Sequence, residues 1–246
     1  MRNALTIGVA AASLLVSTVV GAQNRPTTGF DFKAAEGQLK ATIPFHKSLH
    51  EAERQSDGTR GYGLPNPTAL MAALPNPPPP PFTTQLEWTT YYSYCGWDAI
   101  VRATLLESTP ALTSDKSLVF TISHFTVVDT IKSDAPFTPD QHLVAYRVGG
   151  EVEDAGEKLR IDTPDMAAFE PRKTYILILR RDKGASVRQY SIPQGLTIIV
   201  RNDKVYPISG RYAWLTGADE FPSGAAYADI RNTFTRVSTL KTCDAR

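Results

Sequence analysis

From Ala99 onward the chain repeatedly alternates apolar and polar residues, and this period of two is typical of half-buried β-strands. In the first such run Ala99, Val101 and Leu105 share one face, while Arg102 and Thr104 lie on the other. Further strands are predicted, separated by polar turns, at 117–132, 142–148, 159–161, 175–179, 190–192, 196–200 and 205–208. The sequence therefore predicts a mainly β domain.

One of these strands changes its buried face along its length. Apolar residues at the start of 117–132 share one phase, and those at its end share the other: Leu118, Phe120 and Ile122, then Phe125, Val127 and Ile131. A strand cannot exchange its faces without an extra residue or a sharp bend. We therefore expect a β-bulge or strong coil at Ser123–Phe125, as in the long bent strands of small barrels.

Two further segments complete the predicted architecture. Residues 175–179 are continuously apolar, which indicates a central strand covered on both faces. The period then lengthens in 224–240, where Tyr227, Ile230, Phe234 and Val237 recur at steps of three and four residues. That spacing predicts a carboxy-terminal helix, with Ser223 as its N-cap.

The first 22 residues resemble a cleavable secretory signal peptide. Arg2 supplies the positive end, residues 4–20 are uncharged and apolar, and small residues precede Gln23. The apolar run is short and diluted by polar residues, which disfavours an uncleaved membrane anchor. No Cys follows the cleavage point, so a lipoprotein anchor is not expected, and no second long apolar run follows. We expect a secreted or periplasmic protein without a membrane span after cleavage.

Export changes how the two cysteines are interpreted. In an oxidising compartment Cys95 and Cys243 have only each other as partners within the chain, although two free thiols are the alternative. A bridge between them would close a loop of 148 residues, for which chain entropy gives about 5 kcal/mol before strain is subtracted. It would join the end of the helix to the start of the first strand.

Residues 23–87 differ from the rest of the chain because proline and glycine interrupt them repeatedly. A helical stretch is predicted at 45–55, with Phe45, Leu49 and Ala52 on one side. The run 77–81 is expected to form extended polyproline II, because each proline ring fixes φ and removes a donor. We interpret this region as a partly helical, Pro-rich arm and linker that precedes a domain at 88–246.

The charge balance disfavours two classes of partner. The chain has 26 Lys and Arg against 25 Asp and Glu, and removal of Arg2 with the signal peptide leaves 25 of each. A neutral mature chain lacks the basic surface that nucleic acid or an anionic membrane would require.

The residues 95–104, Cys-Gly-Trp-Asp-Ala-Ile-Val-Arg-Ala-Thr, resemble the opening of netrin-like modules, the type found in tissue inhibitors of metalloproteinases. The run 169–179 resembles the strand that enters the barrel in that family. The resemblance covers about 95–243 and implies an OB-like five-stranded barrel with a carboxy-terminal helix tied back by disulfides. The chain also resembles uncharacterised secreted proteins of soil bacteria.

This sequence departs from the netrin-like pattern in two ways. Only one disulfide is available, whereas such modules usually carry several. The metalloproteinase inhibitors chelate zinc through a free amino-terminal Cys, whereas Cys95 is internal. The inhibitory mechanism is therefore not transferred.

No catalytic motif with supporting spacing is found, and neither a cofactor nor a metal ion is predicted. His46, His50 and Glu53 would share a helix face, but they do not form a His-Glu-x-x-His pattern, so a solvated face is the preferred interpretation. His124 lies at the expected bulge, where it is either a site residue or a hydrogen-bonded residue of the barrel rim.

Aromatic residues concentrate between Trp88 and Trp97, where they either bind a protein or glycan or pack the barrel against the terminal helix. The candidate binding residues are Tyr91, Trp97, His124, Tyr212 and Trp214. Three functions follow as hypotheses: a non-enzymatic binding module, an inhibitor or modulator of an extracellular enzyme, and an enzyme that uses His124. Ligand identity and oligomeric state are not predicted.

Overall fold

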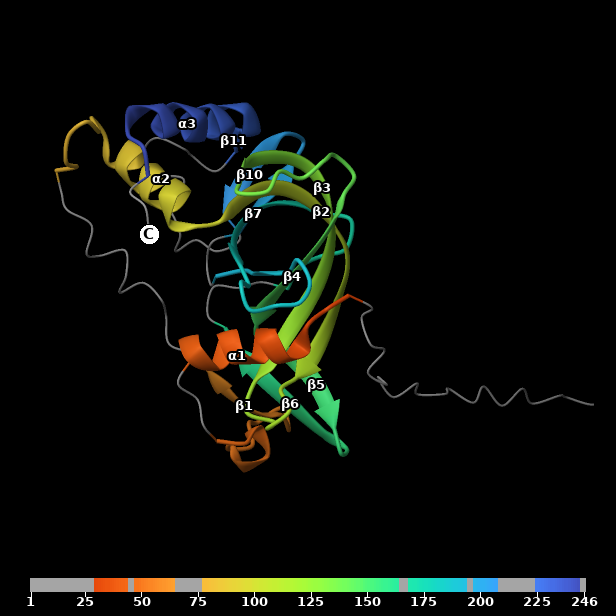
Figure 1. The fold of residues 1–246 in the computed structure, drawn as a ribbon. Helices are drawn as coiled ribbons and strands as arrows, with labels where there is room; N and C mark the ends of the chain where they lie inside the picture. The colour runs from red at the N-terminus through yellow and green to blue at the C-terminus, as the bar shows by residue number, and fades with distance from the viewer. Residues whose placement is uncertain are drawn as a thin grey trace, which may run out of the picture.

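The computed structural model describes residues 29–43, 47–64, 77–163, 168–193, 197–207 and 224–243. Within these ranges the protein is mainly β with a carboxy-terminal helix, as the sequence predicted. The two longest strands run through the length of the molecule, α2 and α3 cover one end, and α1 lies across the body nearer the other end (Figure 1).

From residue 99 to residue 226 the described elements are all strands, and one helix follows them. In chain order they are α1 (Phe32–Thr42), the 3-10 helix η1 (Leu49–Glu51), β1 (Arg60–Gly63), α2 (Gln85–Gly96), β2 (Ala99–Leu112), β3 (Val119–Ser133), β4 (His142–Val148), β5 (Gly150–Asp154), β6 (Glu157–Asp162), β7 (Thr174–Arg181), β8 (Tyr190–Ser191), β9 (Thr197–Arg201), β10 (Lys204–Pro207), β11 (Ala225–Ala226) and α3 (Tyr227–Leu240).

Five strands form a ring. Their order is β7, β2, β3, β4 and β8, and β8 pairs back onto β7. Every neighbouring pair is antiparallel except β4 and β8, which are parallel. The ring closes through two residues only, because Tyr190 and Ser191 of β8 pair with Ala145 and Tyr146 on one side and with the end of β7 on the other.

The sheet also extends outward beyond the ring. β7 pairs with β9 through its first half, and β10 and β11 continue the sheet from β9. β7 thus has a neighbouring strand at each edge. Both of its faces are also covered, as predicted from its continuous apolar run. Its odd-numbered residues Tyr175, Leu177 and Leu179 join a cluster to which all five ring strands contribute. Ile176 and Ile178 join a second cluster beneath α3.

β3 changes faces as expected, and a register shift lies at the predicted level of Ser123–Phe125, but the extra residue belongs to the neighbouring strand β2. Phe120 and Ile122 pack into a cluster with α1, whereas Phe125 and Val127 pack inside the ring. The register shift at this level arises because Leu106 of β2 is the extra residue, opposite the step from Phe125 to His124. Two further shifts occur nearer the end of β3. Hydrophobic phase shows that a fold must bend, but not which strand of a pair carries the extra residue.

The predicted helix at 45–55 is not formed in its described part. Only Leu49–Glu51 make a single 3-10 turn, and Arg54 forms an isolated bridge with Arg60. A helix forms earlier instead, at α1, where the Asp31 carboxylate accepts a hydrogen bond from the Ala34 N–H as an N-cap.

Residues 29–43 and 47–64 pack against the strands that follow residue 88. Ala35 and Leu39 of α1 share one hydrophobic cluster with Leu118 and Phe120. β1 adds to the β5–β6 hairpin as a parallel third strand. This small sheet lies at the end of the molecule opposite α2 and α3 (Figure 1).

The aromatic segment before the first strand is a helix, which the sequence analysis did not predict. α2 has Thr84 as its N-cap, and the buried Glu87 accepts hydrogen bonds from the N–H and hydroxyl of Thr83. The polyproline II prediction for 77–81 is also corrected, because the chain turns at Pro80–Pro81 before the helix.

The carboxy-terminal helix and its disulfide are confirmed. α3 buries Tyr227, Ile230, Phe234 and Val237, the four residues of the predicted face. It begins at Tyr227 rather than Gly224, and its N-cap is Ala226 without a side-chain hydrogen bond. The predicted cap Ser223 lies outside the described residues. Cys95 and Cys243 form a disulfide.

Candidate functional site

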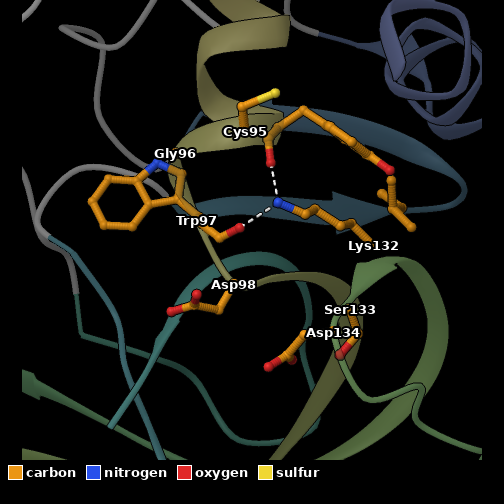
Figure 2. Close-up of a pocket in the computed structure, with 9 residues that line it drawn as sticks. Cys95, Gly96, Trp97, Asp98, Lys132, Ser133 and Asp134 are labelled. Carbon is orange, nitrogen blue, oxygen red and sulfur yellow. Dashed lines mark hydrogen bonds between the residues drawn. The ribbon is translucent and has the colours of Figure 1, made fainter. Parts of the chain in front are cut away.

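A pocket of about 410 Å³ lies where α2 ends and the first strand begins (Figure 2). Residues 94–98 form one wall, and residues 131–134, at the end of β3, form the other. These two segments lie together because Ala99 pairs with Ser133 in the long β2–β3 ladder. The pocket is thus fixed to the end of the five-strand ring on rigid elements.

Lys132 joins the two walls. Its ammonium group donates hydrogen bonds to the Tyr94 carbonyl and, at 2.5 Å, to the Trp97 carbonyl (Figure 2). The last carbonyls of a helix have no partner within the helix, and a lysine satisfies them well because the negative end of the helix dipole lies there. Lys132 also lies 4.9 Å from the centre of the Tyr94 ring.

Trp97 gives the pocket its aromatic surface. The Arg180 guanidinium carbon lies 4.9 Å from the centre of the indole, in a cation–π geometry. The side chain is partly buried against the cluster beneath α3. Trp97 is therefore held in one position, which lowers the entropy cost of presenting it to a ligand.

Two carboxylates, Asp98 and Asp134, lie on opposite walls of the pocket (Figure 2). Asp98 Oδ2 accepts a hydrogen bond from the Arg181 N–H at 2.8 Å, and Asp134 Oδ2 lies 3.3 Å from the Arg181 guanidinium. Both contacts use Oδ2. Within the described part of the chain, Oδ1 of neither carboxylate accepts a hydrogen bond from the protein, so each is available as an acceptor.

Of the predicted binding residues, Trp97 lies in this pocket and Tyr91 lies beneath α3. Tyr91 is 5% exposed, and its hydroxyl donates a hydrogen bond to the Thr242 carbonyl at 2.9 Å. Its ring packs with Phe82, Trp88 and Val237. This packing between helices leaves little of the Tyr91 ring available to a partner.

His124 is remote from the pocket. It pairs with Glu107 and Val144 in the middle of β3, and the strand between His124 and Ile131 spans about 20 Å. Its Nε2 is buried, and within the described part of the molecule it has no hydrogen-bond partner. The structure does not bring His124 and Trp97 together.

The remaining candidates divide between described and undescribed residues. Tyr212, Trp214 and His46 lie outside the described ranges. His50 does not share a helix face with Glu53, because its two ring nitrogens contact Asp154 and Glu157 instead. Among the residues that the structure describes, no group of three His, Cys, Asp or Glu side chains is arranged to hold a metal ion.

Sequence reasoning missed Lys132, Asp134 and Arg181. Each lies far along the chain from Trp97, and only strand pairing brings them to one edge of the ring. The alternation of polar residues at the end of β3 was visible, but it carried no information on which turn or helix those side chains would face.

Neither a scan of protein-family models nor a search of curated proteins finds a match to this chain. In the described ranges, no helix combines the length and apolar character needed to cross a bilayer.

Proposed function

We propose that the protein is an exported, non-enzymatic binding module, secreted or periplasmic, that holds its partner at the pocket beside Trp97. The observation that carries this proposal is the pocket itself, a preformed hollow of about 410 Å³ with a fixed indole and two carboxylates. Small binding sites of this kind combine an apolar or aromatic surface with a few placed polar groups.

The ring supports assignment to an OB-type barrel. β2, β3 and β4 are consecutive antiparallel strands, and β7 returns to lie beside the first of them, which is a Greek key. β8 is then the fifth strand between β4 and β7. OB-folds are five-stranded, partly open Greek-key barrels that bind oligosaccharides or oligonucleotides. This order is also what the netrin-like resemblance leads us to expect.

The chemistry of the pocket favours a glycan as the ligand. Free carboxylate oxygens of Asp98 and Asp134 can accept hydrogen bonds from sugar hydroxyls, and the Trp97 indole can contact the apolar face of a sugar ring. The near balance of acidic and basic residues in the mature chain disfavours nucleic acid.

A glycan array with the mature protein tests this proposal, followed by calorimetry on the best ligand. Trp97→Ala and Asp134→Asn should each weaken binding by about tenfold or more, because each removes a direct contact. Asp140→Asn, at an exposed turn residue, is the matched control and should bind like the unchanged protein. Since Trp97 also packs beneath α3, Asp134→Asn keeps the test valid if Trp97→Ala unfolds. Equal binding by all variants would place the ligand elsewhere.

The inhibitor hypothesis depends on the netrin-like resemblance. Its zinc-chelating mechanism would need Cys95 at a free amino terminus, whereas Cys95 is internal. A pull-down from the secreted fraction distinguishes the two ideas, because recovery of an enzyme whose activity falls on binding would favour an inhibitor. For the enzyme hypothesis, a hydrolytic activity lost in His124→Ala would be the supporting result.

A further inference from the structure

His50 contacts two carboxylates, Asp154 and Glu157, that lie more than a hundred residues further along the chain. Its Nδ1 lies 2.9 Å from Glu157 Oε2, and its Nε2 lies 2.8 Å from Asp154 Oδ2. The side chain is about three-quarters buried, with 26% of its surface exposed. His50 belongs to η1, whereas the carboxylates flank the turn of the β5–β6 hairpin.

Only one protonation state of the ring satisfies both contacts. A carboxylate accepts hydrogen bonds and does not donate them, so each ring nitrogen must carry a proton. A neutral imidazole has one N–H and one lone pair, and its unprotonated nitrogen would face a carboxylate at hydrogen-bond distance. The geometry is therefore that of an imidazolium bound by two charge-assisted hydrogen bonds.

Basic side chains from three elements surround the same carboxylates. Lys116, from the turn between β2 and β3, lies 2.6 Å from Asp154 Oδ2. Arg54 and Arg60 contact Glu157 Oε1 at 2.6 and 3.2 Å. These cations keep both carboxylates ionised, so that His50 is the group in this cluster that titrates near neutral pH.

The same contact fastens residues 47–64 to the body of the protein. Leu49 and Ala52, beside His50, are buried, and Leu49 shares a cluster with Leu118 and Leu159. Tyr62 of β1 donates a hydrogen bond from its hydroxyl to the Ser48 carbonyl. Burial raises the pKa of that hydroxyl, so Tyr62 stays neutral in the range where imidazole titrates.

We propose that His50 makes docking of residues 47–64 depend on pH. Its imidazolium holds this segment against the β5–β6 hairpin, and loss of its proton weakens the contact. Deprotonation removes one of the two hydrogen bonds and leaves a lone pair facing a carboxylate. The apolar contacts of Leu49 remain, so the segment loosens locally while the five-strand ring is unaffected.

The direction of the pH response follows from the shift of His50. The hydrogen bonds from Asp154 and then Glu157 raise its pKa above the ordinary 6.5, against a smaller lowering by burial. A raised pKa in the folded state means that the contribution is complete below 6.5 and is lost as the pH rises through the raised value. Docking is therefore tightest below pH 6.5 and weakens as the pH rises through the raised pKa of His50.

Hydrogen exchange of the full chain between pH 6 and pH 9 tests the proposal, read as protection factors for the β1 amides. In the unchanged protein these factors should fall by about tenfold over this range, as one charge-assisted hydrogen bond is lost. His50→Gln should show weaker protection that does not change with pH. His142→Gln, at an exposed histidine of β4, is the matched control and should behave like the unchanged protein.

Titration of the His50 ring by NMR gives an independent readout. Its pKa should lie above that of histidine in an unfolded peptide and should fall in Asp154→Asn. The proposal is overturned if His50→Gln keeps the full pH dependence, or if the His50 ring titrates at or below the ordinary value.

Discussion

Asp31 is a single residue that connects two parts of the molecule. One carboxylate oxygen accepts the Ala34 N–H at 3.0 Å and caps α1. The other accepts the N–H and hydroxyl of Ser186, both at 2.9 Å. The Asp31 backbone also exchanges hydrogen bonds with the buried Gln189 side chain. One side chain therefore positions the first helix against the loop before β8, the strand that closes the ring.

These hydrogen bonds lead to an acid-dependence prediction. The bonds from Ser186 and Ala34 lower the pKa of Asp31 from 3.8 to about 2. A lowered pKa stabilises the folded state above 3.8, and this contribution is lost as the pH falls towards 2. Asp31→Ala should lower the midpoint of thermal unfolding at pH 7 by more than at pH 2, as measured by circular dichroism.

A matched pair separates the two roles of Asp31. Asp31→Asn keeps an oxygen that can cap α1 but loses one acceptor, so its effect should be intermediate. Glu153→Ala, at an exposed carboxylate of β5, is the control and should change the midpoint little. An equal loss for Asp31→Ala at both pH values would contradict the assignment.

At the scale of elements, the most demanding contact is that of β1 with β6. A Cβ added at Gly61 would lie 1.7 Å from the Arg160 carbonyl oxygen, a distance that no side chain can occupy. The backbones of the two strands approach so closely that only glycine fits, which is one of the reasons for glycine in a strand. Gly63, two residues later, has no such neighbour within 4 Å.

This difference gives a prediction with an internal control. Gly61→Ala should separate β1 from β6 and make residues 47–64 sensitive to limited proteolysis, while Gly63→Ala should remain resistant. The five-strand ring should keep its near-ultraviolet circular dichroism in both variants. If Gly61→Ala and Gly63→Ala were cleaved at the same rate, the docking of β1 would not depend on this close approach.

Pro110 lies within β2 and shows where a proline fits into a long strand. A proline removes a donor from the ladder, so it is tolerated only where that side of a strand has no neighbour. β2 pairs with β7 only as far as Thr104, and Pro110 pairs with Thr121 of β3 on the other side. The strand therefore continues through the proline to Leu112, further than the alternation up to Leu105 indicated.

At the scale of the whole molecule, the disulfide joins the two helices that cover one end of the ring. Cys95 is the penultimate residue of α2 and Cys243 follows α3. Phe82, Tyr91 and Val237 pack between the same helices, and Arg236 of α3 lies 3.2 Å from the buried Glu87 of α2. The covalent bond and this cluster therefore stabilise the same interface.

Removal of the disulfide tests how much that interface depends on it. The double variant Cys95→Ser/Cys243→Ser should lose about 2–4 kcal/mol of unfolding free energy, because the unfolded chain is no longer constrained. Denaturant unfolding of the oxidised, reduced and double-variant proteins measures this loss. The reduced protein and the double variant should agree, and an unchanged midpoint in both would show that packing alone holds the helices.

The local patterns of the chain were sufficient for much of the fold. Periods of two located strands such as β2, β3 and β9, a continuous apolar run located β7, and the spacing of apolar residues located α3, because burial on one face or both leaves its own pattern. The hairpin strand β5 was missed, since its sequence Gly-Glu-Val-Glu-Asp has a single apolar side chain, Val152, which is too few to show a period. α2 was missed because Trp, Tyr and Thr favour strands as single residues, while packing against α3 decided the outcome.

What the sequence alone determined was most of the strands after residue 99, the carboxy-terminal helix, the face change of β3 and the one pairing open to the two cysteines. The strands, the helix and the face change depend on the pattern of neighbouring residues. The cysteine pairing depends on the sequence holding only two cysteines. The tertiary structure decided which strand carries the bulge, how β8 closes the ring, and where His50 and Lys132 find their partners. Those outcomes depend on contacts between residues that are distant in the sequence, such as His50 and Asp154, which are 104 positions apart. A pattern of neighbouring residues does not predict such contacts.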